Sequence, residues 1–498
     1  MPFPRYECLL LLTVSCVSLA PGQPPVTRLN PAIKQIVDAV SEDRLGATMK
    51  RLEAFGTRYV LSEQDSPTHG IGAAQRWIFD EFKSYSPRLQ VSLDKFTAKK
   101  SQRIVHDTDL ANVVAVLPGT IDAERFVVIS SHYDSIAARR GPGTPRTDDE
   151  GPRTPQEVEP VAPGVSDNAS GVAAVLELAR IMSQYEFDKS VVFIAFSAEE
   201  VGLLGSQAYA AKAKQEKLEI EAVLNNDIIG NDVAGNGRSA NNRVRVFSEG
   251  PEDSPSRSLA RYTKEIAERY VPSMTVDLIF RRDRFGRGGD HTSFNREGFA
   301  AVRLTTPSEN YANQHTATDT LANASVPYTA RVARMNAAVL ASLALAPKPP
   351  IVMRPRPPGP PTNGTSTPAP GSSPSPAPPE AVSQRPAGRP MGPGLTRGKS
   401  GYDAALRWEM PKPEPDLAGY AIVIRATTAP LWEREIYVGN VTEYTIPDLS
   451  IDDVVIGVKA IDKDGNQSLV AAYDLPAPLS PARRDDGTGA PRTPTDRQ

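Results

Sequence analysis

The chain has 498 residues, which is enough for two to four domains, and it contains 47 Pro, 5 His and 2 Cys. Its formal net charge of −3 argues against a nucleic-acid-binding protein, which would carry a large basic excess. Two Cys exclude a disulfide-rich scaffold and a Cys-rich zinc module. We therefore expect no nucleic-acid partner.

Residues 1–22 have the pattern of a secretion signal. Arg5 supplies the positive charge, an apolar run follows at 9–19, and the small residues Ala20 and Gly22 precede the expected cleavage site. This run is too short to span a bilayer of ~30 Å, and no later stretch reaches the ~18 consecutive apolar residues of a membrane helix. We predict a secreted protein, periplasmic or extracellular, without a transmembrane segment.

Both cysteines, Cys8 and Cys16, lie inside this signal. Thr13 stands where a lipoprotein signal usually has an aliphatic residue, which argues against a lipid anchor at Cys16. Cleavage near Gly22 would therefore leave a mature chain that has no cysteine and needs no disulfide.

The segment 30–346 alternates between short apolar runs and stretches with helical periodicity. Strands are predicted at 111–117, 126–131, 190–196, 222–226 and 299–305, and helical stretches at 36–55, 73–85, 170–184, 203–214, 256–270 and 329–346. Continuous apolar strands between helices indicate an α/β domain with a mostly parallel central sheet that helices flank on both faces. In such a sheet, ligands bind at the carboxyl ends of the strands.

Histidines and carboxylates follow these predicted strands. They are His132 and Asp134 after 126–131, Asp167 before the helix 170–184, Glu199 and Glu200 after 190–196, Asp227 after 222–226, and His315 in the loop after 299–305. Two His and several carboxylates without sulfur suit a pair of zinc-like ions, and a carboxylate that bridges them would offset their mutual repulsion. One member of the Glu199–Glu200 pair can bind metal while the other accepts a proton.

The same residues lie in six motifs that occur in order: HYD, GVSDNASG, FSAEEVGLLGS, NNDIIG, GGDHTSF and QHTATDT. With these motifs the segment 33–346 resembles the di-zinc aminopeptidases and glutamate carboxypeptidases of metallopeptidase family twenty-eight, which also includes glutaminyl cyclases. The resemblance implies two zinc ions. It implies that one is held by His132, Asp167 and Asp227, and the other by Asp167, Glu200 and His315, with Asp167 bridging.

Further roles follow from the resemblance. It implies that Glu199 is the general base and that Asp134 orients the imidazole of His132, as partners of metal-bound His commonly do. It also implies a cis peptide bond between Asp167 and Asn168. No ligand role carries over to Asp290 and His291, for which a structural role and a substrate contact stay open.

The sequence departs from the family pattern beside the second histidine. Several members have Tyr directly before it, where the hydroxyl can help to hold the oxyanion, but this chain has Gln314. Tyr311 could substitute, or it could simply pack. The basic segment 281–289 is either a solvated rim loop or a contact for a substrate carboxylate. The long segment 136–163 is expected to overhang the site or to be disordered.

The remaining sequence is organised differently. The segment 347–398 holds 17 of the 47 Pro, which predicts an extended tether. The segment 400–476 has short alternating strands and resembles a fibronectin type III sandwich, with Trp408 and Tyr420 as buried aromatics. Residues 477–498 are expected to be a disordered tail. The sandwich would bind a polymer or protein partner, or serve as a spacer.

The leading hypothesis is a secreted di-zinc exopeptidase, most plausibly an aminopeptidase. Metal-activated water would attack the scissile carbonyl while Glu199 takes its proton, and the substrate would be a peptide or protein with a free terminus. A carboxypeptidase or a glutaminyl cyclase of the same family is the alternative within the enzyme class. An inactive scaffold that presents the sandwich is the alternative outside it.

Overall fold

The computed structural model describes residues 29–137, 161–283, 288–352 and 394–473. The expected signal 1–22, the tail 477–498 and most of the segments 136–163 and 347–398 lie outside the described residues. Within the described part of the chain, no helix combines the length and the apolar character that a membrane span requires.

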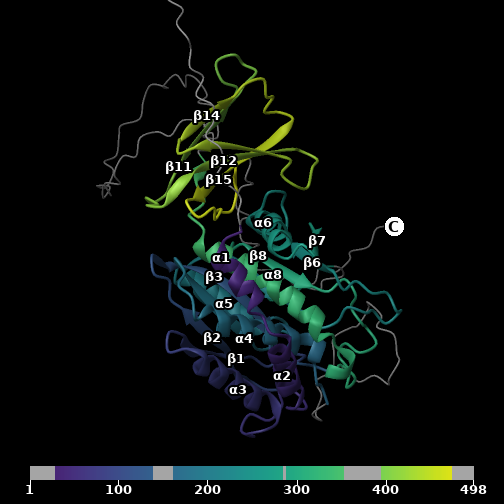
Figure 1. Cartoon of the computed structure of the whole chain (residues 1–498). Helices are drawn as coiled ribbons and strands as arrows, with labels where there is room; N and C mark the ends of the chain where they lie inside the picture. Colours follow the sequence, from purple (N-terminus) through teal and green to yellow (C-terminus); the bar gives the residue numbers. More distant parts are fainter. Residues whose placement is uncertain (1–28, 138–160, 284–287, 353–393, 474–498) are drawn as a thin grey trace, which may run out of the picture.

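The N-terminal unit is built on one eight-stranded sheet with the order β1-β2-β4-β3-β5-β8-β6-β7 (Figure 1). Its strands are β1 Gln90–Ala98, β2 Thr108–Leu117, β3 Asp122–His132, β4 Lys189–Phe196, β5 Glu219–Asn226, β6 Arg243–Ser248, β7 Thr275–Ile279 and β8 Ala301–Thr305. The central strands β4, β3, β5 and β8 are parallel, whereas β1–β2, β2–β4 and β8–β6 pair antiparallel. The pair β6–β7 at one edge is parallel as well, so the sheet is mixed, with parallel pairing at its centre and at that edge.

Helices cover both faces of this sheet. They are α1 Pro31–Asp38, α2 Glu42–Glu53, α3 Gly70–Tyr85, α4 Ser170–Met182, α5 Leu204–Gln215, α6 Pro255–Tyr270, α7 Asp290–Arg296 and α8 Val326–Leu345. The largest apolar core joins one face to α1, α2, α3, α4, α6 and α8, and a smaller core joins the other face to α5 and α7. Successive side chains of a strand point to opposite faces of the sheet, so Val127 and Ile129 of β3 lie in the large core and Val128 lies in the small one.

The helical and strand periodicities located most of these elements. Every predicted strand overlaps an observed one, and the predicted helices 170–184, 203–214 and 256–270 match α4, α5 and α6 within two residues. The N-terminal stretch 36–55 falls across two helices, α1 and α2, because Ser41 caps the second through its hydroxyl. The strands β1, β6 and β7 and the short helix α7 were not predicted from the sequence.

The C-terminal unit consists of two four-stranded sheets. One contains β9 Ile351–Val352, β10 Leu395–Thr396, β11 Ala404–Glu409 and β14 Glu443–Ile446, and the other β12 Leu417–Ala426, β13 Arg434–Gly439, β15 Val454–Asp462 and β16 Ala471–Ala472. Trp408 and Tyr420 are both buried in the core between them, with their ring centroids 5.5 Å apart. The strands β9 and β10 come from the two ends of the expected tether, so these ends belong to a sheet.

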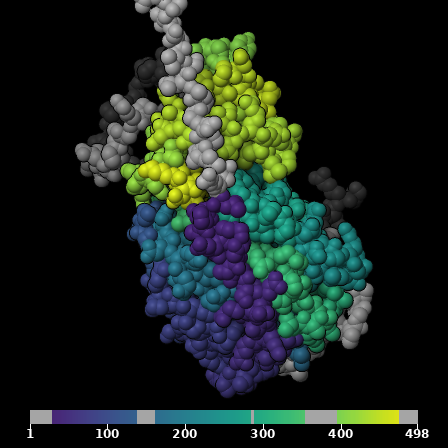
Figure 2. Space-filling model, in the orientation of Figure 1, coloured from purple at the N-terminus to yellow at the C-terminus, as the bar shows by residue number. Residues whose placement is uncertain are grey.

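The two units are in contact through buried charges near the start of α6 (Figures 1 and 2). Asp253 binds Arg261 of α6 at 2.9 Å and Arg425 of the C-terminal unit, and all three side chains are almost fully buried. Arg261 Nε also donates to the carbonyl of Pro430 at 2.7 Å, and Leu469 packs in the large core of the N-terminal unit. The C-terminal unit is thus docked on the sheet domain rather than held only by a tether.

Candidate metal centre

The parallel centre of the sheet brings the predicted site residues to one edge. His132 is the last residue of β3 and pairs with Phe196, the last residue of β4. Glu199 and Glu200 follow β4 directly, and Asp227 follows β5. Because parallel strands end at the same edge, side chains that are distant in sequence converge there.

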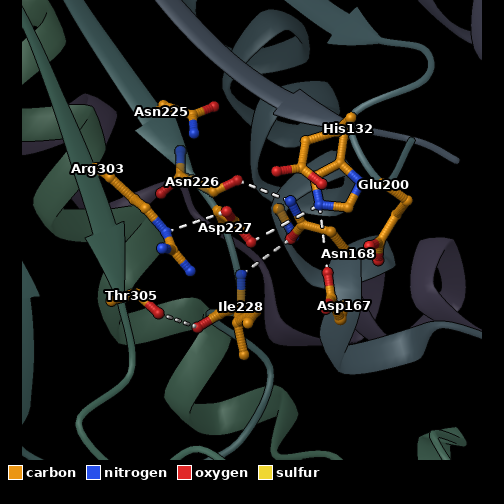
Figure 3. A network of polar contacts seen from close by, with 12 residues as sticks. His132, Asp167, Asn168, Glu200, Asn225, Asn226, Asp227, Ile228, Arg303 and Thr305 are labelled. Atoms are coloured by element: carbon orange, nitrogen blue, oxygen red, sulfur yellow. Dashed lines mark hydrogen bonds and ion pairs between the residues drawn. The ribbon is translucent and has the colours of Figure 1, made fainter. Parts of the chain in front are cut away.

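His132, Asp167 and Asp227 form the first group of potential metal ligands (Figure 3). The Nε2 atom of His132 lies 3.2 Å from Asp167 Oδ1 and 3.7 Å from Asp227 Oδ1. It is fully buried and has no hydrogen-bond partner among the described residues, although it faces two carboxylate oxygens. A buried polar nitrogen without a partner costs folding free energy, and a cation bound to its lone pair would provide that partner.

Asp167, Glu200 and His315 form the second group. The Nε2 atom of His315 lies 2.9 Å from both Asp167 Oδ2 and Glu200 Oε1. Burial lowers the pKa of His315, but Glu200 and Asp167 outweigh this effect and raise the pKa to about 9. Asp167 therefore turns Oδ1 toward the first group and Oδ2 toward the second, as a bridging carboxylate does.

These two groups have the composition that zinc requires. Each offers one imidazole nitrogen and two carboxylate oxygens, and the ligand atoms of a group lie within 4.8 Å of one another. Nitrogen and oxygen ligands without sulfur, with room for water or substrate, are typical of catalytic zinc sites. The two groups are the same two sets that the family resemblance implied, and the residues present fit the metal.

Asp134 holds the turn that carries the paired glutamates. Its Oδ1 and Oδ2 atoms accept hydrogen bonds from the backbone N–H groups of Glu199 and Glu200, both at 3.1 Å. The imidazole Nδ1 of His132 lies closer to the backbone carbonyl of Asp134, at 3.1 Å, than to its carboxylate, at 3.6 Å. The carboxylate thus orients the glutamates as well as facing the histidine.

Glu199 lies beside both ligand groups. It forms a third cluster with His132 and Glu200 whose ligand atoms are also within 4.8 Å of one another. Burial, together with the charges of Asp227 and Glu200, raises the pKa of Glu199 well above its usual value, although His132 opposes this shift. A carboxylate with a raised pKa next to a metal centre is suited to accept and return a proton.

The loop that carries Asp167 is held by two residues whose roles sequence reasoning missed. Asp319 accepts the backbone N–H groups of Ser166 and Asp167 at 2.9 and 3.0 Å. Gln314, which stands where relatives have Tyr, donates from Nε2 to Asp167 Oδ2 at 2.9 Å. The peptide bond between Asp167 and Asn168 is cis, which confirms the prediction.

Arg58 also holds the loop that carries Asp167, and sequence reasoning missed this role as well. Its fully buried guanidinium donates to the backbone carbonyls of Tyr133, Pro163 and Gly164 at 2.6 to 2.8 Å. Burial lowers its pKa to about 10, although the nearby Asp319 opposes this shift. The sequence does show one signal for this role, because Arg58 is a charged residue between two apolar stretches. Nothing in the sequence indicates which carbonyls it binds.

The remaining candidates lie outside the two ligand groups. Asp290 and His291 begin α7, where burial raises the pKa of Asp290 to about 7 and lowers that of His291 to about 3. Tyr311 lines a cavity of about 610 Å³ together with Arg243 and Arg245, and none of the candidate ligands lines this cavity.

Comparison with known proteins identifies the family. Residues 112–340 match the model of peptidase family M28, and this range contains every candidate ligand. A probable zinc metalloprotease of Leptosphaeria maculans is 32% identical over 475 residues, which cover 89% of this chain and 97% of that protein. A probable zinc metalloprotease of Pyricularia oryzae is 33% identical over 94% of this chain and 91% of that protein. The chain belongs to peptidase family M28. It is accordingly a zinc metallopeptidase, and peptides are its substrates.

Solved structures are more distant. The LapA aminopeptidase of Legionella pneumophila matches 64% of this chain and 75% of its own, with 19% identity and a TM-score of 0.48. BSAP, a zinc aminopeptidase from Bacillus subtilis, matches 60% of this chain and 94% of its own, with 14% identity and a TM-score of 0.45.

Proposed function

We propose that this M28 peptidase is a secreted di-zinc exopeptidase that removes N-terminal residues from peptides. The observation that carries the proposal is the position of Asp167, whose two oxygens face two separate sets of ligands. Glu199 lies beside both sets with a raised pKa, which is what a general base needs. The expected signal in residues 1–22 supports export.

Different side chains have different roles in peptide hydrolysis. Two zinc ions bound by the ligand groups would supply Lewis acidity toward the scissile carbonyl and toward the attacking water. Glu199 accepts the proton of that water and delivers it to the leaving amine. Asp134 fixes the backbone of Glu199, and Asp319 and Gln314 keep the bridging Asp167 in place.

The charges around the site favour an amino group over a carboxylate as the recognised terminus. The buried carboxyl groups of Glu199 and Asp290 lie beside the ligands and can accept hydrogen bonds from a substrate ammonium, whose charge would favour their ionised forms. Arg282, a candidate for binding a substrate carboxylate, already pairs with Glu249 at 3.1 Å. These contacts support an aminopeptidase over the carboxypeptidase alternative.

The C-terminal unit has a role of its own in this proposal. Its two sheets and the buried Trp408–Tyr420 pair support a fibronectin type III-like sandwich. The buried contacts of Arg425 with Asp253 support a sandwich that moves with the catalytic domain. We propose that it presents a polymer or protein partner at a fixed position relative to the enzyme.

The decisive experiment is digestion of a peptide library by the purified full-length chain. We expect trimming from the N-terminus, inhibition by a chelator and recovery with zinc. Glu199→Gln should keep about two zinc per chain and lower kcat by roughly 10²–10⁴-fold. Trimming from the C-terminus would overturn the aminopeptidase proposal, and full activity of Glu199→Gln would overturn the role of that residue.

A further inference from the structure

One positive charge lies directly against the candidate ligands. Arg303 is on β8, a strand that is otherwise apolar or hydroxylic, and its side chain is almost fully buried. Its Nε atom lies 3.0 Å from Asp227 Oδ2 (Figure 3). The guanidinium also lies 6.0 Å from the ring centroid of Phe247. Its Nη1 atom donates to Asp283 Oδ2 at 2.9 Å and to the carbonyl of Gly288 at 3.1 Å. These partners fix the guanidinium in one orientation.

The ion pair divides the two oxygens of Asp227 between different partners. Oδ1 faces His132 Nε2 at 3.7 Å and is the oxygen available to a cation in the first ligand group. Oδ2 is bound by Arg303. Asp227 can therefore offer a cation a single oxygen, and the adjacent guanidinium withdraws part of the negative charge that this oxygen would contribute.

In the described part of the chain, the carboxylates of the second ligand group have no such ion pair, and Arg103 donates only to the backbone carbonyl of Glu200, at 3.2 Å. The group's own carboxylate, Glu200, pairs with His315 at 2.9 Å. Within the ranges that the structure describes, no Lys or Arg side chain forms an ion pair with Glu200 or with the shared Asp167. Among the described residues, the two groups are equal in the number and type of their ligands but differ in charge, because the first has a guanidinium 3.0 Å from one of its carboxylates.

We propose that Arg303 is a positioning residue that makes the two cation sites unequal. It holds Asp227 so that one oxygen faces the site, and its charge weakens that oxygen as a ligand. The site of His132 and Asp227 therefore binds its zinc more weakly than the site of Glu200 and His315. This inference rests on the proposed two-zinc function.

The test is a zinc titration of the full-length chain after chelation, followed by calorimetry. The unmodified protein should bind two zinc ions with different Kd values. Arg303→Met keeps an unbranched apolar stem but removes the charged guanidinium. It should lower the larger Kd by about tenfold, within the range that partners of metal ligands control, and leave the smaller Kd within twofold. A larger Kd that is unchanged within twofold, or that rises, overturns the proposal.

Two further variants make the result specific. Arg125→Met is a matched control, because Arg125 is also a buried arginine of the sheet but pairs with Glu221 at the opposite edge. It should leave both Kd values within twofold. Asp283→Asn removes the second carboxylate of Arg303, so more of the positive charge acts on Asp227 and the larger Kd should rise severalfold.

The Asp283 variant also decides the matter if Arg303→Met does not fold, as judged by circular dichroism. In that case an unchanged larger Kd in Asp283→Asn overturns the proposal. Two zinc ions with equal Kd values in the unmodified chain would overturn the inference but leave the proposed function intact. One zinc ion, or none, would overturn the two-zinc function and the role of Arg303 with it.

Discussion

Two buried clusters of charged side chains differ in how their negative charges are neutralised. Where the C-terminal unit docks, Asp253 lies between the guanidinium groups of Arg261 and Arg425, which are 3% and 1% exposed. At the strand ends, Asp167 and Glu200 are similarly buried, but among the described residues their ionic partners are imidazoles alone. The first cluster carries its own counter-charges, whereas the second requires a cation from solution.

The difference separates a structural cluster from a functional one. A buried carboxylate that is paired with arginine is satisfied by the folded chain itself and offers nothing to a ligand. A group of buried carboxylates that face one another destabilises the chain until a cation binds, and this makes the fold selective for metal. Arg303 is intermediate, because it gives one ligand of the metal cluster a counter-charge of the structural kind.

The largest expected effect comes from removing the shared carboxylate. Asp167→Asn should reduce zinc binding to at most one ion per chain and abolish detectable peptidase activity, since both ligand groups lose an anionic oxygen. Metal analysis by mass spectrometry and a peptide-release assay measure the two effects. Retention of two zinc ions would show that Asp167 does not bridge.

Breaking the docking cluster should instead lower stability and preserve catalysis. Asp253→Asn removes the buried carboxylate that Arg261 and Arg425 share. The two guanidiniums keep only the half-exposed Glu252 as a carboxylate partner, so the change should cost about 1–3 kcal/mol of unfolding free energy. Activity measured well below the Tm should be unchanged. Lys99→Met, which breaks an exposed ion pair, is the control and should leave the Tm where it is. An unchanged Tm in Asp253→Asn would show that the docking cluster does not stabilise the fold.

The chelated protein should also show a pH dependence that zinc removes. The pKa of His315 is about 9 in the folded chain, above its ordinary value of 6.5. Its pairing therefore stabilises the chelated fold fully below pH 6.5, and this contribution, about 3 kcal/mol, is lost as the pH rises through 9. Urea unfolding at pH 6 and pH 9.5 measures it. With zinc bound, the imidazole is a neutral ligand, and the loss should be much smaller.

The smallest expected effect is at Asp134. Asp134→Asn replaces one of two acceptor oxygens with a donor that faces a backbone N–H, so the turn of Glu199 and Glu200 should shift. We expect about a tenfold loss of zinc affinity, with the Tm of the chelated protein nearly unchanged. A lower Tm of the chelated protein without a change in zinc affinity would assign Asp134 a purely structural role.

Local pattern was sufficient to predict much of this molecule. Apolar runs located β2, β3, β4, β5 and β8, because a strand buried on both faces needs an unbroken apolar stretch. The edge strands β1 and β7 are only partly buried, and β6 alternates arginine with valine in its first half, so their patterns were weaker. Docking of the C-terminal unit could not be predicted, because Arg425 and Asp253 are distant in sequence and carry no local signal of their pairing.

The sequence by itself determined which residues stand at the ends of which strands, and therefore that two histidines and several carboxylates share one edge. Only the tertiary structure decided how they are used. In the folded chain, Asp319 and Gln314 hydrogen-bond to Asp167. Asp134 binds the backbone of the paired glutamates, and Arg303 forms an ion pair with Asp227. The physical reason is that the ends of buried strands follow from local periodicity, whereas the partner of a buried charge is set by side chains that meet only when the whole chain has folded.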